Sequence, residues 1–471
     1  MTFCETFDNK NPGIPSRTGD LNPNVWGVSR LIQNINLGQG LYNGWAATTQ
    51  LQTCSGATII TPPNDIMICN GQLREAVNDD PSGTFEGGWP AVLAMYPKQP
   101  FDFAGRTGTV SFEVSNDSHG THAAWPEFWM SNLPVPAPFI HEAGTLMSLP
   151  QHGFGIRFGG TADPGSWNLC PNANNLSVRR WTVDSAAVVR NYIMDDTFNS
   201  GIIPASPSNV QTSMAVRQLD CVIAPADGSG VTNHVEIQVS QNQIDVYATD
   251  AGVAPSPSTL RHIAVITNAN LSFTRGLIWL EDAHYNADKG DPAFPSQRQH
   301  TFVWDNVAFD GPFTYRDFSY DALDANQSYA TTDPNFANTL NLAKFSAANQ
   351  TASWNVLNMP ANPQASAVRV LFSFYYEATI PTALNVTVNG HAHSVPWPYP
   401  DTTQYWSSWR TFAVTIPITD LVSGTNVVQL GANQPLVTSN VNIVLVQVPG
   451  GVPVLPGSNN AYPAGGALPS Q

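Results

Sequence analysis

Residues 119–158 read HGTHAAWPEFWMSNLPVPAPFIHEAGTLMSLPQHGFGIRF, and their pattern is that of a β-protein. If residues 125–130 form a strand, Trp125, Glu127 and Trp129 share one face. Phe128 and Met130 fall on the opposite face, and their side chains suit a hydrophobic core. This stretch therefore predicts one strand with a core face and a face of a different character.

The same two-residue period recurs on both sides of this stretch. Apolar alternation predicts a strand over 109–114, a hairpin that turns at Ser240–Gln243, and strands at 277–280 and 301–309. After the turn sequence Asp-Gly-Pro at 310–312, a second series begins with residues 367–376, which are apolar almost throughout, as in a strand buried on both faces. Further strands are expected at 384–388, 410–416 and 441–448. We place a domain boundary near residue 315, with a second domain over 316–450 and a Pro/Gly-rich tail over 451–471.

Composition agrees with an all-β reading. The 471 residues include 35 Gly and 38 Pro, against 35 Asp plus Glu and 19 Lys plus Arg, which excludes a coiled coil or a helical array. Hydrophobic residues make up 42% of the chain, so it can bury sizeable cores. Many short strands joined by Gly/Pro turns satisfy both facts.

The net charge and the length of the apolar runs argue against two classes of partner, nucleic acids and membranes. The net charge of −16 disfavours nucleic acid and anionic lipid, and no apolar run reaches the roughly 20 residues that span a bilayer. We therefore expect neither nucleic acid nor a membrane as partner. The N-terminal sequence MTFCETFDNK has no basic region followed by an apolar one, so a signal peptide, if the precursor has one, is absent from this sequence.

Cysteines and glycosylation sequons favour an extracellular location. The five cysteines, at positions 4, 54, 69, 170 and 221, lack the spacing of a zinc site. Cys54 with Cys69 and Cys170 with Cys221 are plausible disulfide pairs, which leaves Cys4 over. Six N-x-S/T sequons are present, at Asn116, Asn175, Asn270, Asn326, Asn349 and Asn385.

The Trp–Glu–Trp face suits a sugar-binding cleft. Indole faces stack on pyranose rings, and a carboxylate between them can act on the glycosidic oxygen. The alternative is a tryptophan pair packed under a loop, with Glu127 in a salt bridge to an arginine. Spacing alone leaves both readings open.

Two phrases resemble a known family. MYPKQPFDFAGRTGTVSFEV (95–114) followed by WPEFWM (125–130) is similar to the laminarinase-type family 16 glycoside hydrolases and their concanavalin A-like relatives. HTFVWDNVAFDGP (300–312) is similar to the closing strands of that superfamily. The resemblance implies a concanavalin A-like two-sheet jelly roll over residues 1–315 and activity on a polysaccharide.

The catalytic motif of that family is incomplete here. The family's acidic strand reads E-I-D-I-x-E, whereas the corresponding stretch is HEAGTLMS at 141–148, in which only Glu142 remains, at the nucleophile's position. Glu127 replaces the family's alanine on the adjoining strand, so we take Glu142 as nucleophile and Glu127 as acid/base of a retaining mechanism. A register slip of one residue would present His141 in place of Glu142.

Other polar residues near this segment have less specific roles. His119, His122, His141 and His152 lack a familiar metal-ligand spacing, so we expect His141 and His152 to bind substrate by hydrogen bonding rather than to hold a metal. Glu281, Asp282 and His284 follow the strand at 277–280 and are expected in a solvated loop that could reach the cleft rim.

No cofactor is needed for this chemistry, but the resemblance implies a possible structural calcium ion. Glu5 and Asp305, near the first and last strands of the first domain, are the candidate ligands because Ca²⁺ prefers oxygen ligands. Asp305 could equally accept hydrogen bonds from loop amides.

The second domain resembles, in pattern more than in signature residues, the galactose-binding-like jelly rolls appended to carbohydrate-active enzymes. A loop at 395–409 crowds five aromatic residues: Trp397, Tyr399, Tyr405, Trp406 and Trp409. They form either a stacking platform for glycans or a contact with the first domain.

The sequence thus predicts an extracellular glycoside hydrolase acting on a β-linked glucan or galactan in an open cleft. The alternative is a glycan-binding or adhesive protein on the same scaffold that has lost catalysis. A polysaccharide lyase would need a basic subsite for uronates, and the shortage of lysine argues against it.

Overall fold

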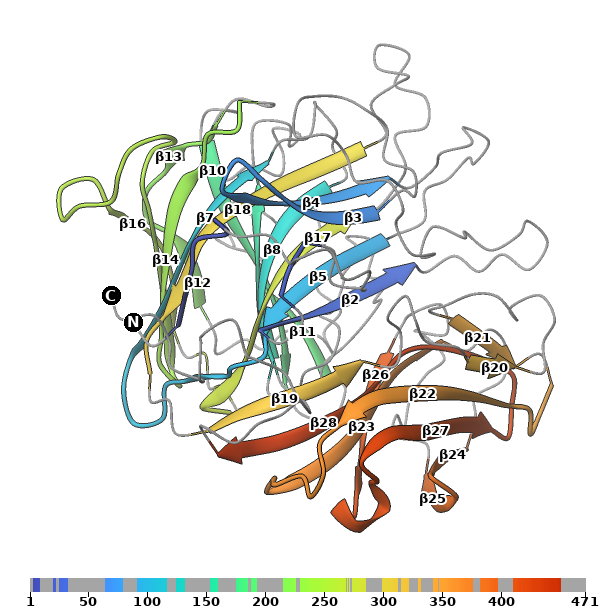
Figure 1. Cartoon of the computed structure of the whole chain (residues 1–471). Coiled ribbons are helices and arrows are strands. Elements are labelled where there is room, and N and C mark those ends of the chain that lie inside the picture. Colours follow the sequence, from blue (N-terminus) through green and yellow to red (C-terminus); the bar gives the residue numbers. More distant parts are fainter. Residues whose placement is uncertain are drawn as a thin grey trace.

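The computed structural model is built from β-strands (Figure 1). It describes residues 3–8, 20–22, 25–32, 64–78, 91–116, 124–131, 153–159, 175–184, 188–192, 215–225, 229–267, 269, 271, 273–284, 299–311, 315–321, 329–331, 342–345, 347–375, 382–396 and 410–449. Strands of these segments pair antiparallel throughout, and the one helical element among them is the 3₁₀ turn η2 (Ile418–Asp420).

Two nine-stranded sheets are formed by β1 to β18. The first sheet runs in the order β12 (Ala215–Gln218), β16 (Arg261–Thr267), β15 (Gln243–Ala248), β14 (Asn233–Val239), β7 (Gly108–Asn116), β18 (Gln299–Phe309), β4 (Gln72–Asn78) and β3 (Asn64–Cys69), with β1 (Phe3–Glu5) also on β18. The second runs in the order β11 (Val188–Tyr192), β10 (Asn175–Asp184), β9 (Gly153–Gly159), β8 (Ala124–Ser131), β17 (Arg275–His284), β5 (Ala91–Pro97) and β2 (Trp26–Ile32). Two short strands join the second sheet, β13 (Val222–Ile223) beside β10 and β6 (Phe101–Asp102) beside β17.

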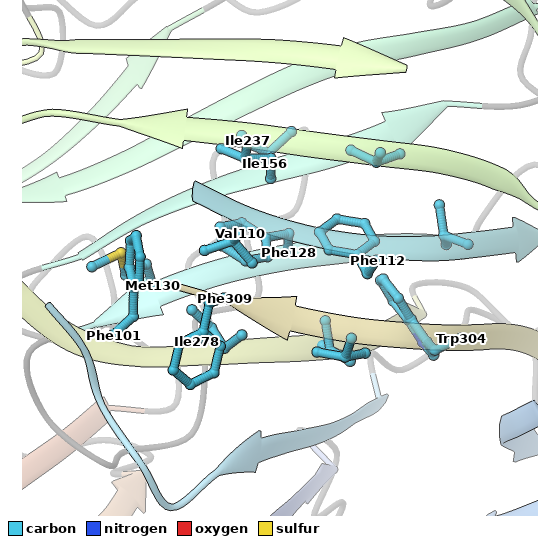
Figure 2. Close-up of a cluster of buried hydrophobic side chains, with 14 of the residues drawn as sticks. Phe101, Val110, Phe112, Phe128, Met130, Ile156, Ile237, Ile278, Trp304 and Phe309 are labelled. Atoms are coloured by element: carbon cyan, nitrogen blue, oxygen red, sulfur yellow. The ribbon is translucent and has the colours of Figure 1, made fainter. Parts of the chain in front are cut away.

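The core of this part lies between the two sheets. Val110 and Phe112 from β7 meet Phe128 and Met130 from β8 in one buried cluster (Figure 2), and the Phe112 and Phe128 rings stack with centroids 5.6 Å apart. Trp304 of β18 closes the cluster against Phe112. The predicted alternation of residues 109–114 is confirmed, because Val110, Phe112 and Val114 are all buried in this core.

The remaining two sheets have five strands each. One contains β19 (Tyr315–Asp321), β28 (Leu436–Pro449), β23 (Ala367–Tyr375) and β26 (Arg410–Ile416), with β21 (Leu342–Phe345) on β28. The other runs in the order β20 (Tyr329–Thr331), β22 (Thr351–Met359), β27 (Gly424–Ala432), β24 (Ala383–Val388) and β25 (His391–Pro396). Side chains of both sheets form a second core around Trp354. The fold is therefore all-β, with a two-sheet jelly roll followed by a smaller β-sandwich, as predicted.

Strand β23 explains the continuous apolar run in its sequence. Val368, Val370 and Phe372 point into the second core, while Leu371 packs on the other face with Val444. Both faces are buried, so alternation with polar residues is not needed.

A buried asparagine fixes one end of the second sandwich. Asn426 is fully buried, and its side-chain oxygen accepts hydrogen bonds from Asn389 Nδ2 (2.8 Å) and from the Val422 amide (2.9 Å). Its Nδ2 donates to the Val422 carbonyl at 2.8 Å. Asn389 lies in the β24–β25 turn with a φ of 50°, so this network ties that turn to the loop that precedes β27.

Cysteine chemistry agrees with the expectation in part. Cys69 and Cys221 form disulfide bonds, whereas Cys4 is a thiol whose pKa is raised chiefly by burial. The other two cysteines, at positions 54 and 170, lie outside the described residues. The described residues include no helix long and apolar enough to cross a bilayer.

Candidate functional site on the second sheet

Strand β8 carries the Trp–Glu–Trp motif in the interior of the second sheet, between β9 and β17. Phe128 and Met130 enter the inter-sheet core, so Glu127 and Trp129 lie on the opposite face of the sheet, as the alternation predicts. We call this the outer face of the second sheet. The side chain of Trp125 lies outside the described parts of the chain.

Glu127 is held by its neighbour on the same strand. The Trp129 indole Nε1 donates a hydrogen bond of 2.7 Å to Glu127 Oε2, and both side chains are fully buried. On the flanking strands the register partners of Glu127 are Glu281 of β17 and Arg157 of β9. Glu281 is also fully buried.

Aromatic rings line the outer face next to Glu127. The Trp129 ring lies over Gly155 of β9, and a Cβ added to this glycine would stand 2.3 Å from the ring. The Tyr96 ring of β5 lies over Gly27 of β2 in the same way, and a Cβ added to Gly27 would stand 2.2 Å from it. Trp279 of β17 is the register partner of Trp129, and its ring centroid is 4.2 Å from that of Tyr96. These three rings, Tyr96, Trp279 and Trp129, form what we call the aromatic row.

A charged row runs beside the aromatic row, two residues further along each strand. Its members, connected by direct register pairs, are Glu281, Glu127, Arg157 and Arg179 of β10. The side chains of Arg157 and Arg179 lie outside the described parts of the chain, whose backbone gives only their register positions.

Two residues of this site differ from the sequence-based expectation or escaped it. Glu281 was expected in a solvated loop, but β17 extends to His284 and buries it, because the strand pairs with β8 and β5 over this whole length. Tyr96 lies near the end of β5, and the pairing of β5 with β17 brings its ring against Trp279. This contact depends on which strands are neighbours, so the sequence alone does not reveal it. The spacing Leu277, Trp279, Glu281 could have signalled a longer strand.

Several predicted site residues lie outside the described residues: Glu142, His141, His152, Trp397, Trp406 and Trp409. The pairing of Glu127 with Glu142 therefore stays a prediction. Among the described strands, β17 and β9 flank β8 at Glu127, and the residue of β17 that lies opposite Glu127 is the carboxylate Glu281.

The chemistry open to this site follows from the Glu127–Glu281 pair. Directly opposite residues of an antiparallel pair have Cβ atoms about 4.5–5.5 Å apart, so two carboxylates there can approach the roughly 5–5.5 Å separation of a retaining glycosidase. However, Glu127, Glu281, Trp129, Trp279 and Tyr96 are all at most 2% exposed. A polysaccharide cannot touch them in this conformation.

The candidate calcium ligands lie at the other sheet. Glu5 of β1 accepts hydrogen bonds from the Phe7 amide (2.9 Å) and from Trp26 Nε1 (3.4 Å). Burial raises the pKa of Glu5, and these hydrogen bonds, which lower the pKa, offset only part of that effect. Asp305 of β18 accepts a hydrogen bond from the Asn306 amide (2.7 Å), the loop-amide alternative considered above.

Burial, followed by the nearby carboxylates of Glu113, Asp8 and Glu5, raises the pKa of Asp305 to about 6, although the Asn306 amide opposes this. A cation would relieve that repulsion. Within the described segments, however, no group of three or more His, Cys, Asp or Glu side chains is arranged to hold a metal, so these residues alone do not complete a calcium site.

Comparisons with known proteins give structural likeness only. No family model matches the chain, and no curated protein matches its sequence. A β-1,3-1,4-glucanase (lichenase) derived from a mouse hindgut metagenome shares 11% identity, with a TM-score of 0.31, over 65% of this chain and 98% of its own.

An immunostimulatory antigen and pseudo β-1,3-glucanase of Mycobacterium tuberculosis shares 13% identity, with a TM-score of 0.31, over 66% of this chain and 98% of its own. A CBM35 module from Cellvibrio japonicus shares 25% identity, with a TM-score of 0.17, over 25% of this chain and 78% of its own. At these TM-scores the comparisons assign no activity and no site residue to this chain.

Proposed function

We propose that this chain is an extracellular, polysaccharide-active protein that hydrolyses a β-linked glucan or galactan, with Glu127 as acid/base group. Because Glu127 is fully buried in the conformation described above, this function requires a second conformation in which the outer face of the second sheet is open to the polysaccharide. The observation that carries the proposal is the register pair of Glu127 and Glu281, two carboxylates beside the aromatic row on the face opposite the core. In a retaining reaction one carboxylate attacks the anomeric carbon while the other protonates the leaving glycosidic oxygen, and the latter then activates the water that releases the sugar. Glu142 remains the predicted nucleophile, and Glu281 is the second candidate for that role.

A second function is favoured by a specific observation. Because Glu127 and Glu281 are fully buried, the protein could bind a glycan elsewhere without hydrolysing it, and the carboxylates would then serve the fold. Trp397, Trp406 and Trp409 of the second domain are the stacking residues we propose for such binding. A structural calcium ion near Glu5 and Asp305 belongs to this proposal as well.

One experiment separates the two functions. The purified protein is incubated with a panel of neutral and acidic polysaccharides, and release of reducing ends is measured alongside binding. Hydrolysis predicts release that Glu127→Gln abolishes without unfolding the protein, because glutamine still accepts the Trp129 hydrogen bond. Glu142→Gln and Glu281→Gln then identify the nucleophile. Binding without release establishes the second function, and wild-type turnover in all three variants rules out the assigned carboxylates.

A further inference from the structure

Two hairpins of the molecule turn through the same dipeptide. Asn70 and Gly71 join β3 to β4, and Asn389 and Gly390 join β24 to β25 (Figure 1). The φ angles are 54° and 75° in the first turn and 50° and 89° in the second, so both are two-residue turns of type I′. A third Asn-Gly pair, at 43–44, lies outside the described residues.

An Asn-Gly pair is open to a spontaneous chemical change, and asparagine is among the thermolabile residues. The backbone nitrogen of the glycine attacks Cγ of the asparagine, and the amide group leaves as ammonia with the proton of that nitrogen. Water opens the resulting five-membered succinimide to aspartate or isoaspartate, so that a neutral amide becomes a carboxylate. Glycine has no side chain to hinder the attack. The asparagine side chain must first swing over the next peptide group, so contacts that hold its amide slow the reaction.

The side-chain amide of Asn389 is fixed by three hydrogen bonds. Its Nδ2 donates to the Asp420 carbonyl oxygen and to Asn426 Oδ1, both at 2.8 Å. Its Oδ1 accepts a hydrogen bond from the Val427 amide, also at 2.8 Å. Asn426 is fully buried and cannot follow a rotation of Asn389. These bonds must break before Cγ can reach the nitrogen of Gly390.

The Asn70 amide has no such restraint. The residue is exposed, and its side chain makes no hydrogen bond within the part of the chain that the structure describes. Gly71 is crowded only on one side, where Asp8 Oδ1 would lie 3.3 Å from an added Cβ. The Asn70 side chain can therefore rotate toward the Gly71 nitrogen without breaking a contact of the fold.

We infer that Asn70 is a site of spontaneous deamidation in the folded protein, whereas Asn389 is protected by its hydrogen bonds. The two turns share the dipeptide and the backbone conformation, so the ratio of their rates isolates the effect of those bonds. Three hydrogen bonds, each contributing roughly a factor of 2–10, should make Asn389 react about 10–1,000 times more slowly than Asn70. The inference is independent of the proposed function, because it requires only water and the chain itself.

The product adds a negative charge to a turn that already lies beside a carboxylate. Asp8 packs against this turn, and it is one of the groups whose repulsion raises the pKa of Asp305. Isoaspartate also inserts one more carbon atom into the backbone of a turn that pairs Cys69 directly with Gln72. Both changes strain the β3–β4 hairpin, so the deamidated protein is expected to have a lower Tm than the fresh protein.

The test follows both sites in one sample. The purified full chain is stored folded in mildly alkaline buffer, and portions are reduced, digested at acidic pH and analysed by mass spectrometry for amide, aspartate and isoaspartate at Asn70 and Asn389. A second sample is stored unfolded in guanidinium chloride. We expect fast loss of the Asn70 amide and slow loss of the Asn389 amide in the folded sample. The two rates should become similar in the unfolded sample, where the hydrogen bonds of the fold are absent.

Asn70→Gln is the matched control. Glutamine keeps the amide and the charge but must close a larger ring, so this variant is expected to keep its amide and its Tm on storage while Asn389 behaves as in the wild type. Similar rates at Asn70 and Asn389 in the folded protein, or a ratio that stays the same after unfolding, overturn the inference. An equal fall in Tm of stored wild type and stored Asn70→Gln overturns the assignment of the destabilisation to Asn70.

Discussion

Gly155→Ala is the sharpest test of the geometry around Glu127. An alanine Cβ at this position would lie 2.3 Å from Cδ2 and Cε2 and 2.4 Å from Cε3 of the fully buried Trp129 ring. Contacts of this kind ordinarily begin near 3.4 Å, so the indole must shift by more than about 1 Å or the strands must separate. Either movement strains the packing of β8 against β9.

Two costs add in this variant. Overpacking of a filled interior costs about 1–3 kcal/mol. Displacing the indole also breaks the 2.7 Å bond from Trp129 Nε1 to Glu127, which costs a further 1–3 kcal/mol or so because the carboxylate is buried. The entropy gained by replacing glycine returns about 0.5–1 kcal/mol. We therefore expect a net loss of about 3 kcal/mol and a fall in Tm of roughly 5 °C, since the unfolding entropy of about 2.1 cal/mol/K per residue is summed over a domain of about 315 residues.

Thermal and urea denaturation of the purified protein would measure this loss. Gly105→Ala is the control: Gly105 has a φ of 69° and no heavy atom within 4 Å of an added Cβ, so backbone strain alone should cost about 1 kcal/mol. A Trp129→Leu background should reduce the cost of Gly155→Ala, because the shorter side chain vacates the ring position. A Gly155→Ala loss no larger than that of Gly105→Ala, or an undiminished loss in the Trp129→Leu background, would refute the arrangement of ring, glycine and carboxylate.

Three further predictions concern the rest of the molecule. Asp305→Asn should stabilise the protein at pH 8 by about 1 kcal/mol, a value discounted for the partial exposure of the side chain. The Asp305 carboxyl group has a pKa of about 6 in the folded protein and 3.8 as an ordinary aspartate, so the wild type loses stability as the pH rises from about 4 through 6. The gain should vanish below about pH 4, and an unchanged gain across urea titrations at both pH values would contradict the assigned repulsion. If calcium binds beside Glu5 and Asp305, adding Ca²⁺ should raise the Tm of the wild type but not of Asp305→Asn in a melting assay, and equal responses would exclude Asp305 as a ligand. Asn426→Ala should destabilise the second sandwich by about 2–4 kcal/mol in urea, because the fully buried Asn426 side chain makes three hydrogen bonds that the variant loses. Replacement of the exposed Asn385 by alanine should change the stability little, and similar losses in the two variants would argue against the network.

Strand positions were predictable because burial on one face imposes a two-residue period. The hairpin around residues 240–243 illustrates this, since Val239 pairs with Ile244 and the apolar residues on both strands are buried. Residues 367–376 were recognisable by the opposite feature, an apolar run without alternation, which a strand buried on both faces requires. In each case the signal lies within a single segment.

The composition of the site was less predictable, because it depends on which strands become neighbours. Glu127 stood out between two tryptophans, but its register partners Glu281 and Arg157 are 154 and 30 residues away in the chain. Glu281 also follows a short apolar run, and the spacing Leu277, Trp279, Glu281 is the one local indication that the strand continues through it. Pairing over long sequence separations is set by the whole sheet, so the charged row became visible only once the order β10, β9, β8, β17 was known.

The burial of Glu127 and Glu281 must be explained under either proposed function. Two ionised carboxylates in a dry environment repel each other strongly, so they persist only with nearby positive groups or shared protons. Arg157 is the register partner of Glu127, and a fold that needed only a packed sheet could replace this set by uncharged residues at little cost. A triple variant with Glu127, Glu281 and Arg157 changed to Gln, Gln and Met would thus retain stability if the charges serve no fold requirement, and its loss of glycan binding or cleavage would show that they are kept for the substrate. A triple variant that unfolds would instead assign the row to structure and leave the second domain as the glycan-binding part.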